Sequence, residues 1–293
     1  LPRARDMHLW NWLAVATGAR GVVHWCYLTE RTGHEAGGFG LVRPDGSHTP
    51  RSLAVKDVVK QLHQQQDVIL GSTVPTQVAV LYDPDNSSLL FAMELEDVLY
   101  GNSHIGYYRA IWRADLAARY VTPDELDDIV EPVLVVPMTL LVDDATAERI
   151  ARFVHRGGTL IAEARTGMFD ARGWLREQVP AGKLAEVFGV VEGEMIASDA
   201  AHAGLVPSAD GTVLSRRPDD LAPIDPIHLG PPIQFDWPHE VEISAREFLV
   251  PLSLAGARAI ARHGDMVLAA HHRYGQGNAY YIGTHLGFAL YDN

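Results

Sequence analysis

Residues 132–162 restrict the fold of this chain more than any other stretch. An apolar run at 132–137 is followed by a helical pattern at 143–156 and a second apolar run at 159–162. The helical part ends at Gly157-Gly158 and carries one apolar stripe, formed by Ala147, Ile150, Ala151 and Val154. Runs that are apolar on both faces suit a parallel sheet covered by helices, so this order predicts a right-handed parallel crossover.

Similar alternation continues on both sides of this crossover. Residues 78–82 indicate a strand, followed by helical patterns at 88–100 and 105–114 and a strand at 118–121. Near the end of the chain, two β-rich runs at 266–272 and 279–283 flank Gly275-Gln276-Gly277 and predict a hairpin. In the Pro- and Gly-rich stretch 165–247, only a helix near 184–188 is predicted. We therefore expect an α/β domain over residues 75–293, with a doubly wound, mostly parallel sheet.

The N-terminal 70 residues form a separate, smaller segment. Helical spacing from Met7 to Thr17 is followed by a β-rich run at 21–27, a Gly-rich loop at 33–40 and an amphipathic helix at 52–66. The chain opens almost inside its first helix and does not begin with Met. We therefore expect it to be a piece of a longer protein.

Composition excludes several classes of function. The net charge is −13 and the 24 Lys and Arg residues form no dense run, so neither nucleic acid nor an anionic membrane is an expected partner. No apolar stretch approaches the roughly 20 residues that span a bilayer. The only cysteine, Cys26, permits no intramolecular disulfide, and we expect a cytoplasmic protein. None of the 14 histidines has metal-binding spacing, so we expect no metal site and no cofactor.

Several phrases resemble glycoside hydrolase family 42, the β-galactosidase type. Residues 7–12 (MHLWNW), 18–25 (GARGVVHW) and 35–46 are similar to the last helix and eighth strand of that family's TIM barrel. Residues 133–144, 157–160 and 273–281 (RYGQGNAYY) are similar to its middle domain. The ordered series covers most of the chain. It implies an incomplete TIM-barrel fragment at 1–70, followed by a flavodoxin-like or amidotransferase-like oligomerisation domain at 75–293.

The resemblance also implies a function for the parent protein, namely retaining hydrolysis of terminal β-galactosides by a trimeric enzyme. That reaction needs two carboxyl groups about 5 Å apart. In such barrels they follow the fourth and seventh strands, so the matching positions would precede residue 1. We therefore expect no catalytic residue in this chain.

Two residues are candidates for binding sugar. Trp25 ends the predicted eighth strand on the rim where barrel active sites are built, and its face could stack on a pyranose ring; the alternative is a packing role. Glu35 matches a family glutamate that hydrogen-bonds galactose; the alternative is a solvated loop carboxylate. The family's Arg after the tryptophan and His three residues after the glutamate are replaced by Cys26 and Gly38, which is a departure in the galactose-binding pattern.

Other motifs favour structural roles. The turn at 137–140 offers no cysteine nucleophile for an amidotransferase reaction, and Gly275-Gln276-Gly277 lies between strands instead of before a helix. Adjacent His271 and His272 should point to opposite faces of a strand. The acidic residues at 124–128 suit a solvated helix start. Three aromatic residues should pack a helix on the sheet or serve a subunit interface: Tyr107, Tyr108 and Trp112.

The sequence thus predicts an assembly role, with a homo-oligomer, trimer or dimer, as the expected state. One alternative is part of an active β-galactosidase or related exo-glycosidase whose full-length form takes a carbohydrate substrate. The other is a small-ligand-binding α/β module that uses the carboxyl edge of the sheet.

Overall fold

The chain consists of two compact units, Leu1–Pro75 and Thr76–Asn293. In this computed structural model the described residues are 2–94, 98–197, 232–236, 238–245 and 248–292. Much of the stretch 165–247, for which the sequence predicts few elements, lies outside them. The two units are described separately below.

The first unit is built on two helices, α1 (Ala4–Ala16) and α2 (Pro50–Gly71), which pack against each other. Thr49 caps α2 because its side chain accepts a hydrogen bond from the Ser52 amide. The Trp12 indole donates to the Gln61 side chain at 3.2 Å and so joins the two helices. The apolar core is small, and its buried side chains are Met7, Val42, Ala54 and Val58.

The strand predicted at residues 21–27 is absent, and this prediction was wrong. These residues are irregular, and a single parallel bridge between Leu28 and Val42 lies just beyond them. A β-strand requires a neighbouring strand to complete its hydrogen-bond ladder, and the described part of this unit supplies none. The β-rich composition of the run therefore does not suffice to form a strand.

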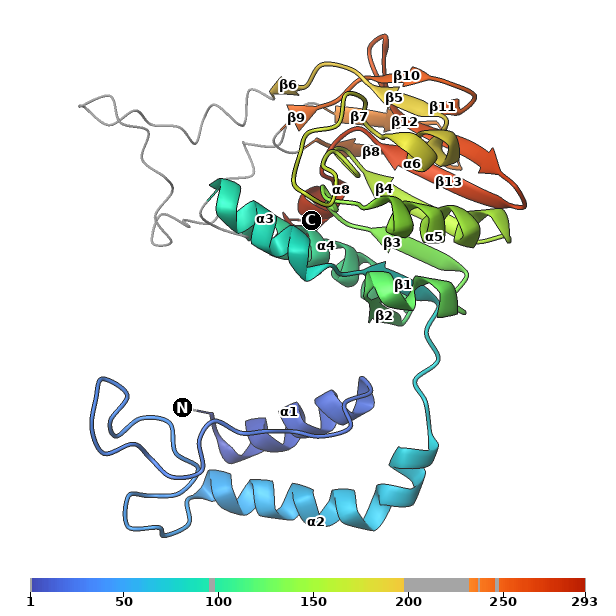
Figure 1. Cartoon of the computed structure of the whole chain (residues 1–293). Coiled ribbons are helices and arrows are strands. Elements are labelled where there is room, and N and C mark those ends of the chain that lie inside the picture. Colours follow the sequence, from blue (N-terminus) through green and yellow to red (C-terminus); the bar gives the residue numbers. More distant parts are fainter. Residues whose placement is uncertain (1, 95–97, 198–231, 237, 246–247, 293) are drawn as a thin grey trace, which may run out of the picture. The chain divides into compact units, whose positions relative to one another are not determined.

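The second unit is built around a nine-stranded mixed sheet, with strand order β2-β1-β3-β4-β13-β12-β11-β7-β8 (Figure 1). Neighbours from β2 to β13 pair in parallel, and those from β13 to β8 pair antiparallel. The parallel strands are β1 (Val78–Leu81), β2 (Ala118–Val121), β3 (Val133–Val136), β4 (Thr159–Glu163) and β13 (Gly277–Ile282). The others are β7 (Pro232–Phe235), β8 (Val241–Ser244), β11 (Arg258–His263) and β12 (Met266–Tyr274).

Two small sheets accompany this central sheet. One consists of β5 (Val190–Glu192) and β10 (Leu252–Leu254), and the other consists of β6 (Ile196–Ala197) and β9 (Phe248–Leu249).

Within the central sheet, the predicted hairpin between β12 and β13 is confirmed. His271 and His272 do point to opposite faces: the first contacts the Asn278 side chain, and the second contacts the Val187 carbonyl.

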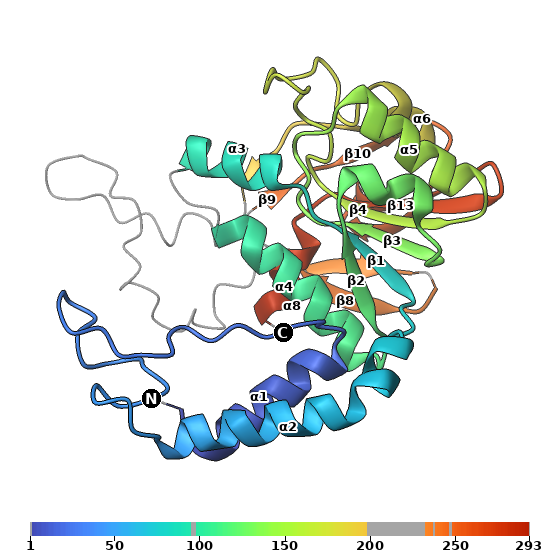
Figure 2. The same cartoon turned by 60° about the horizontal axis from the view of Figure 1, so that its bottom comes forward.

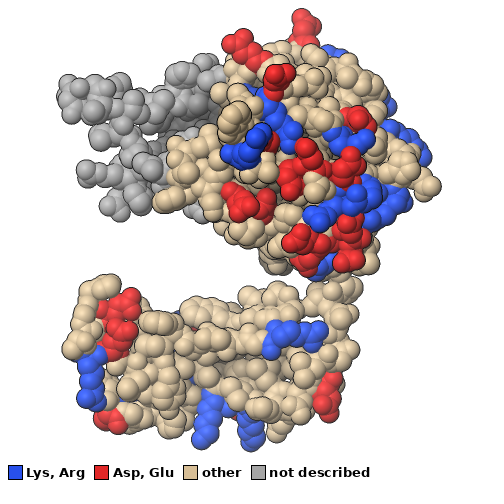
Figure 3. Space-filling model, viewed as in Figure 1, with Lys and Arg blue, Asp and Glu red and all other residues tan. Residues whose placement is uncertain are grey.

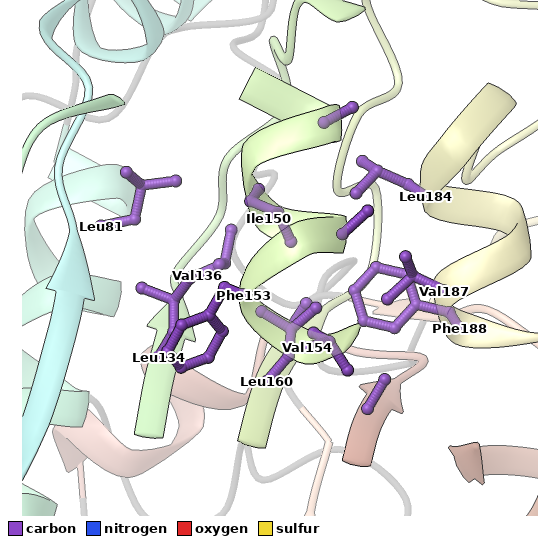
Figure 4. Packing of buried hydrophobic residues seen from close by; sticks show 14 of the residues in the cluster. Leu81, Leu134, Val136, Ile150, Phe153, Val154, Leu160, Leu184, Val187 and Phe188 are labelled. Carbon is purple, nitrogen blue, oxygen red and sulfur yellow. The ribbon is translucent and has the colours of Figure 1, made fainter. Parts of the chain in front are cut away.

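Helices cover both faces of the parallel half. They are α3 (Pro84–Glu94), α4 (Val98–Arg113), the 3-10 helix η1 (Pro123–Asp128), α5 (Asp144–His155), α6 (Gly182–Phe188) and α8 (Leu286–Asp292). On one face, α5 and α6 enclose the largest apolar cluster, which includes Leu134, Val154 and Phe188 (Figure 4). On the other face, α4 and α8 pack together over Val80 and Val135 (Figure 2). Each fully buried aliphatic side chain contributes roughly 1.5–3 kcal/mol.

The α5 crossover forms as its sequence predicts, whereas the two helices before β2 begin earlier than predicted. Asp143 caps α5 through the Thr146 amide at 2.6 Å, and the apolar stripe of the helix is buried. In α3, the Asp83 carboxylate accepts a hydrogen bond from the Asp85 amide and starts the helix at Pro84, a position where proline loses no helical hydrogen bond. Among the described helices, none combines the length and apolar character required to cross a bilayer.

Candidate functional site

The two predicted sugar-binding residues lie in the irregular segment between α1 and α2. The Trp25 side chain is highly exposed, at 74 %, and its peptide bond to Cys26 is cis. The side chain of Glu35 is partly exposed and lies 3.9 Å from the His34 ring, its Oε1 facing Nε2. Backbone hydrogen bonds from Leu41 to the Cys26 carbonyl and from Val42 to the Tyr27 carbonyl close the loop between them. No described contact joins Trp25 to Glu35.

Carboxylates elsewhere in the first unit are engaged in local structure. Asp6 forms an ion pair with Arg3 and accepts hydrogen bonds from the side chain and the backbone amide of Arg3. These hydrogen bonds hold the pKa of Asp6 below its usual value. Asp45 accepts a hydrogen bond from the Ser47 amide, and Asp57 accepts one from Gln61. Each of these three carboxylates is therefore held by a residue within four positions of it in the chain.

The second unit has a buried carboxylate at the carboxyl edge of its sheet. Glu163, the last residue of β4, is fully buried. Its Oε1 accepts hydrogen bonds from the Ser103 hydroxyl and the Met138 amide, each at 2.7 Å. Its Oε2 accepts from the Tyr107 hydroxyl at 3.1 Å and from the Gly287 amide at 2.8 Å. Burial raises the pKa of Glu163, and the four donors oppose that shift.

Through these four bonds, Glu163 connects α4, the turn after β3 and the first turn of α8. The Met138 backbone has a positive φ of 38°, so the turn after β3 is sharp, and the Met138 side chain is buried. In an amidotransferase-like fold, a nucleophile at this turn would need a thiolate and a nearby histidine. A buried thioether cannot supply that nucleophile, so the turn has a packing role.

A second polar cluster lies nearby, between β13, β5 and the loop after β4. The Glu192 carboxylate accepts hydrogen bonds from the Tyr281 hydroxyl and the Arg165 amide, both at 2.7 Å, and pairs with the Arg165 guanidinium at 3.4 Å. Burial raises the pKa of Glu192. This cluster joins β5, β13 and the loop after β4.

Two histidines are buried without hydrogen-bond partners among the described residues. His104 on α4 is surrounded by the rings of Tyr82, Tyr100 and Tyr120, with centroids 4.3–5.7 Å from its own. His285, after β13, packs edge-on against the Phe248 ring at 4.5 Å. Burial lowers the pKa of His104 to about 4 and that of His285 to about 3.

Sequence reasoning missed both Glu163 and His104. A glutamate directly after an apolar parallel strand is a detectable signal, because such strand ends are buried and often carry function. His104 offered no comparable signal, since its burial depends partly on two tyrosines distant in sequence, Tyr82 after β1 and Tyr120 in β2. In the described part of the chain, no group of three His, Cys, Asp or Glu side chains could hold a metal ion.

Comparison with known proteins shows which family this chain resembles. Residues 76–214 match the family model described as the beta-galactosidase trimerisation domain. This segment is similar to the trimerisation domain of β-galactosidases. The matched residues contain β1 to β6 and Glu163 with three of its four donors, and the predicted resemblance to glycoside hydrolase family 42 is confirmed.

The similarity extends beyond the trimerisation domain to nearly the whole chain. Beta-galactosidase BgaB of Geobacillus sp. (strain Y412MC61) is 23% identical over 285 residues, which are 95% of this chain and 38% of BgaB. Beta-galactosidase BglY of Alicyclobacillus acidocaldarius is 26% identical over 286 residues, which are 93% of this chain and 37% of BglY. A solved structure of a catalytic mutant of Gan42B, a GH42 beta-galactosidase from G. stearothermophilus, matches the fold with a TM-score of 0.75 at 20% identity.

That structural match covers 99% of this chain and 40% of the Gan42B chain. The chain therefore spans about 38% of the length of the curated relatives described above. Activities in the names of these relatives belong to proteins more than twice as long.

Proposed function

We propose that this chain is the assembly part of a β-galactosidase-like glycoside hydrolase, in which residues 76–293 drive homo-oligomerisation. The observation that carries the proposal is the trimerisation-domain match over residues 76–214, on a unit with a complete sheet and a large apolar core. Residues 1–75 are the end of a catalytic barrel on this proposal. Their small core and exposed side chains, Trp25 among them, suit a segment that is completed by further barrel strands.

The reaction itself requires residues outside this chain. The carboxylates Asp6, Asp45 and Asp57 are held by local contacts. Those of Glu163 and Glu192 are buried, and each accepts hydrogen bonds from its neighbours. None of these five is placed as a proton donor facing a nucleophile. We therefore expect the isolated chain to bind its own copies and to hydrolyse no glycoside.

Sedimentation equilibrium of the purified chain over a hundredfold concentration range tests the assembly role. We expect a molar mass that is a multiple of the 32.1 kDa chain mass and a dissociation constant in or below the micromolar range. A strict monomer at every concentration would refute the assembly role.

The alternative is that this chain is part of an active β-galactosidase or related exo-glycosidase. The position of Trp25 and Glu35 in one exposed loop segment favours it. An assay with an aryl β-galactoside separates the two. Turnover that is abolished by Glu35→Gln but kept in Glu30→Gln, a change of another carboxylate in the same segment, would favour the alternative. No turnover by the parent chain is the result expected from the assembly role.

A further inference from the structure

The outward flank of α4 is apolar, which is unusual for a helix that covers a sheet. From Tyr100 onward, its exposed residues are Ile105, Tyr108, Trp112 and Arg113. The first three follow the i, i+3, i+7 spacing of one helix face. A helix normally buries its apolar stripe and exposes polar residues, so α4 has a second apolar stripe in addition to the buried one.

Neighbouring elements extend this stripe into a patch. Tyr108 stacks on Tyr120 of the edge strand β2 with ring centroids 6.2 Å apart, and Tyr82 meets Tyr120 edge-on at 6.4 Å. We define the aromatic face as six residues, with exposed fractions from 36% to 69%: Tyr82, Ile105, Tyr108, Trp112, Leu116 and Tyr120. Two of its tyrosines, Tyr82 and Tyr120, also contact the buried His104 ring, with centroids 5.7 Å away.

The helix on the opposite side of the sheet provides an internal comparison. Exposed residues of α5 include Asp144, Glu148, Arg152 and His155. Arg152 forms an ion pair with Asp127 of η1 at 2.8 Å. Acidic and basic residues are interspersed over this side of the unit (Figure 3). The α5 side is therefore a solvated surface, and the aromatic face differs from it in composition.

We propose that the aromatic face is the surface through which a second copy of this chain binds. The inference rests on the proposed assembly function and assigns that function to particular residues. Tyr and Trp are enriched where protein interfaces are most buried, and an exposed edge strand beside them is a surface that proteins normally cover.

Area and charge both favour a second copy as the occupant. Complete burial of an aromatic side chain removes roughly 150–250 Å², so six half-exposed side chains supply several hundred Å² of the roughly 800 Å² that each partner gives to a standard interface. The chain has a net charge of −13, so its copies repel each other. The exposed charges at the end of α4, Arg113 and Asp115, are opposite in sign, so together they add no net charge to a contact made there.

Matched tryptophan substitutions in the full chain test this assignment. Trp112 and Trp174 are 69% and 68% exposed, so neither is part of a buried core, but only Trp112 belongs to the aromatic face. We expect Trp112→Glu to raise the dissociation constant of the oligomer at least tenfold and Trp174→Glu to leave it unchanged. Circular dichroism and the thermal midpoint check that both variants fold.

The outcomes distinguish this inference from the proposed function. If the parent chain is oligomeric and Trp112→Glu is equally oligomeric, the aromatic face is not the interface, although the assembly role stands. If the parent chain is monomeric, the assembly role and the assignment of the aromatic face are both refuted.

Photo-crosslinking identifies the occupant without a destabilising substitution. A benzoylphenylalanine at position 108, in a mixture of ¹⁴N- and ¹⁵N-labelled chains, should give adducts of two chain masses that include mixed-isotope species. Adducts formed only within single chains, onto residues 2–75, would show that the first unit covers the face and would overturn the proposal.

Discussion

At the scale of single residues, the buried Glu163 carboxylate holds α4, α8 and the turn after β3 together through four hydrogen bonds. Glu163→Gln would turn one acceptor oxygen into a donor that faces two existing donors, either the Ser103 hydroxyl and Met138 amide or the Tyr107 hydroxyl and Gly287 amide. Unsatisfied buried donors cost about 1–3 kcal/mol each, so we expect a loss of roughly 3 kcal/mol in unfolding free energy. Urea titration followed by circular dichroism measures it.

The control for this change is Glu186→Gln, which removes a carboxylate paired with Lys183 on the exposed side of α6. A surface ion pair contributes at most about 1 kcal/mol. Equal losses in the two variants would mean that the Glu163 bonds add nothing beyond ordinary surface contacts.

The two buried histidines predict acid sensitivity. Burial lowers their pKa to about 4 for His104 and about 3 for His285, whereas an unfolded histidine protonates near pH 6.5. The unfolded state therefore binds more protons as the pH falls below about 6.5, and stability is lost in that direction, by up to about 1.4 kcal/mol per pH unit for each histidine.

His104→Phe should reduce this dependence between pH 6.5 and pH 4. The phenylalanine ring suits the aromatic cluster formed by Tyr82, Tyr100 and Tyr120, and it carries no titrating group. Urea midpoints at half-unit pH intervals provide the comparison. A variant with the same pH slope as the parent chain would exclude His104 as a source of the acid sensitivity.

At the scale of elements, the contact between α4 and α8 depends on two glycines. A Cβ at Gly106 would overlap the Gly287 carbonyl oxygen, and a Cβ at Gly287 would overlap the Ser103 hydroxyl. Gly106→Ala should therefore separate the helices and cost several kcal/mol, read as a lower thermal midpoint. Gly101→Ala on the same helix meets nothing within 4 Å and should be neutral or gain up to about 1 kcal/mol. Similar midpoints for both variants would contradict the close crossing.

Elements were predictable where their own residues determine them. The crossover β3-α5-β4 forms as expected because its cap, apolar stripe and strands all lie within residues 132–163. The run at 21–27 fails because strand formation depends on a partner outside the segment. The edge position of β2 and the antiparallel pairing beyond β13 depend on segments that are distant in sequence. Local sequence patterns therefore do not predict them.

At the scale of the whole molecule, the two units should differ in stability. Among the described residues, α2 buries only Ser52, Ala54 and Val58 over 22 residues, whereas β3 and β4 lie inside the largest apolar cluster. We expect amide protection in β4 to exceed that in residues 62–71 at least a hundredfold. Hydrogen exchange with mass spectrometry measures both at once. Equal protection would mean that contacts beyond those within the first unit stabilise α2.

The family resemblance was recognisable from ordered short phrases, but the candidate surface was not. Tyr107, Tyr108 and Trp112 were predicted to pack on the sheet or to form an interface. Tyr107 is buried against Glu163, while the other two face solvent. Which residues of one helix point inward depends on how the helix is rotated on the sheet. The close approach of Gly106 to Gly287 and the hydrogen bonds from Ser103 and Tyr107 to Glu163 fix the inward face of α4.

The position of β13 has a consequence for synthesis. This strand follows every other strand in the chain, yet it lies between β4 and β12 and joins the parallel and antiparallel halves. A nascent polypeptide therefore emerges from the ribosome with the β4 edge of its sheet unpaired until residues 277–282 leave the exit tunnel. The hydrogen-bond ladder between β4 and β12 can be completed only after residues 277–282 have been synthesised, and until then the open edge is a site for chaperones or misassembly.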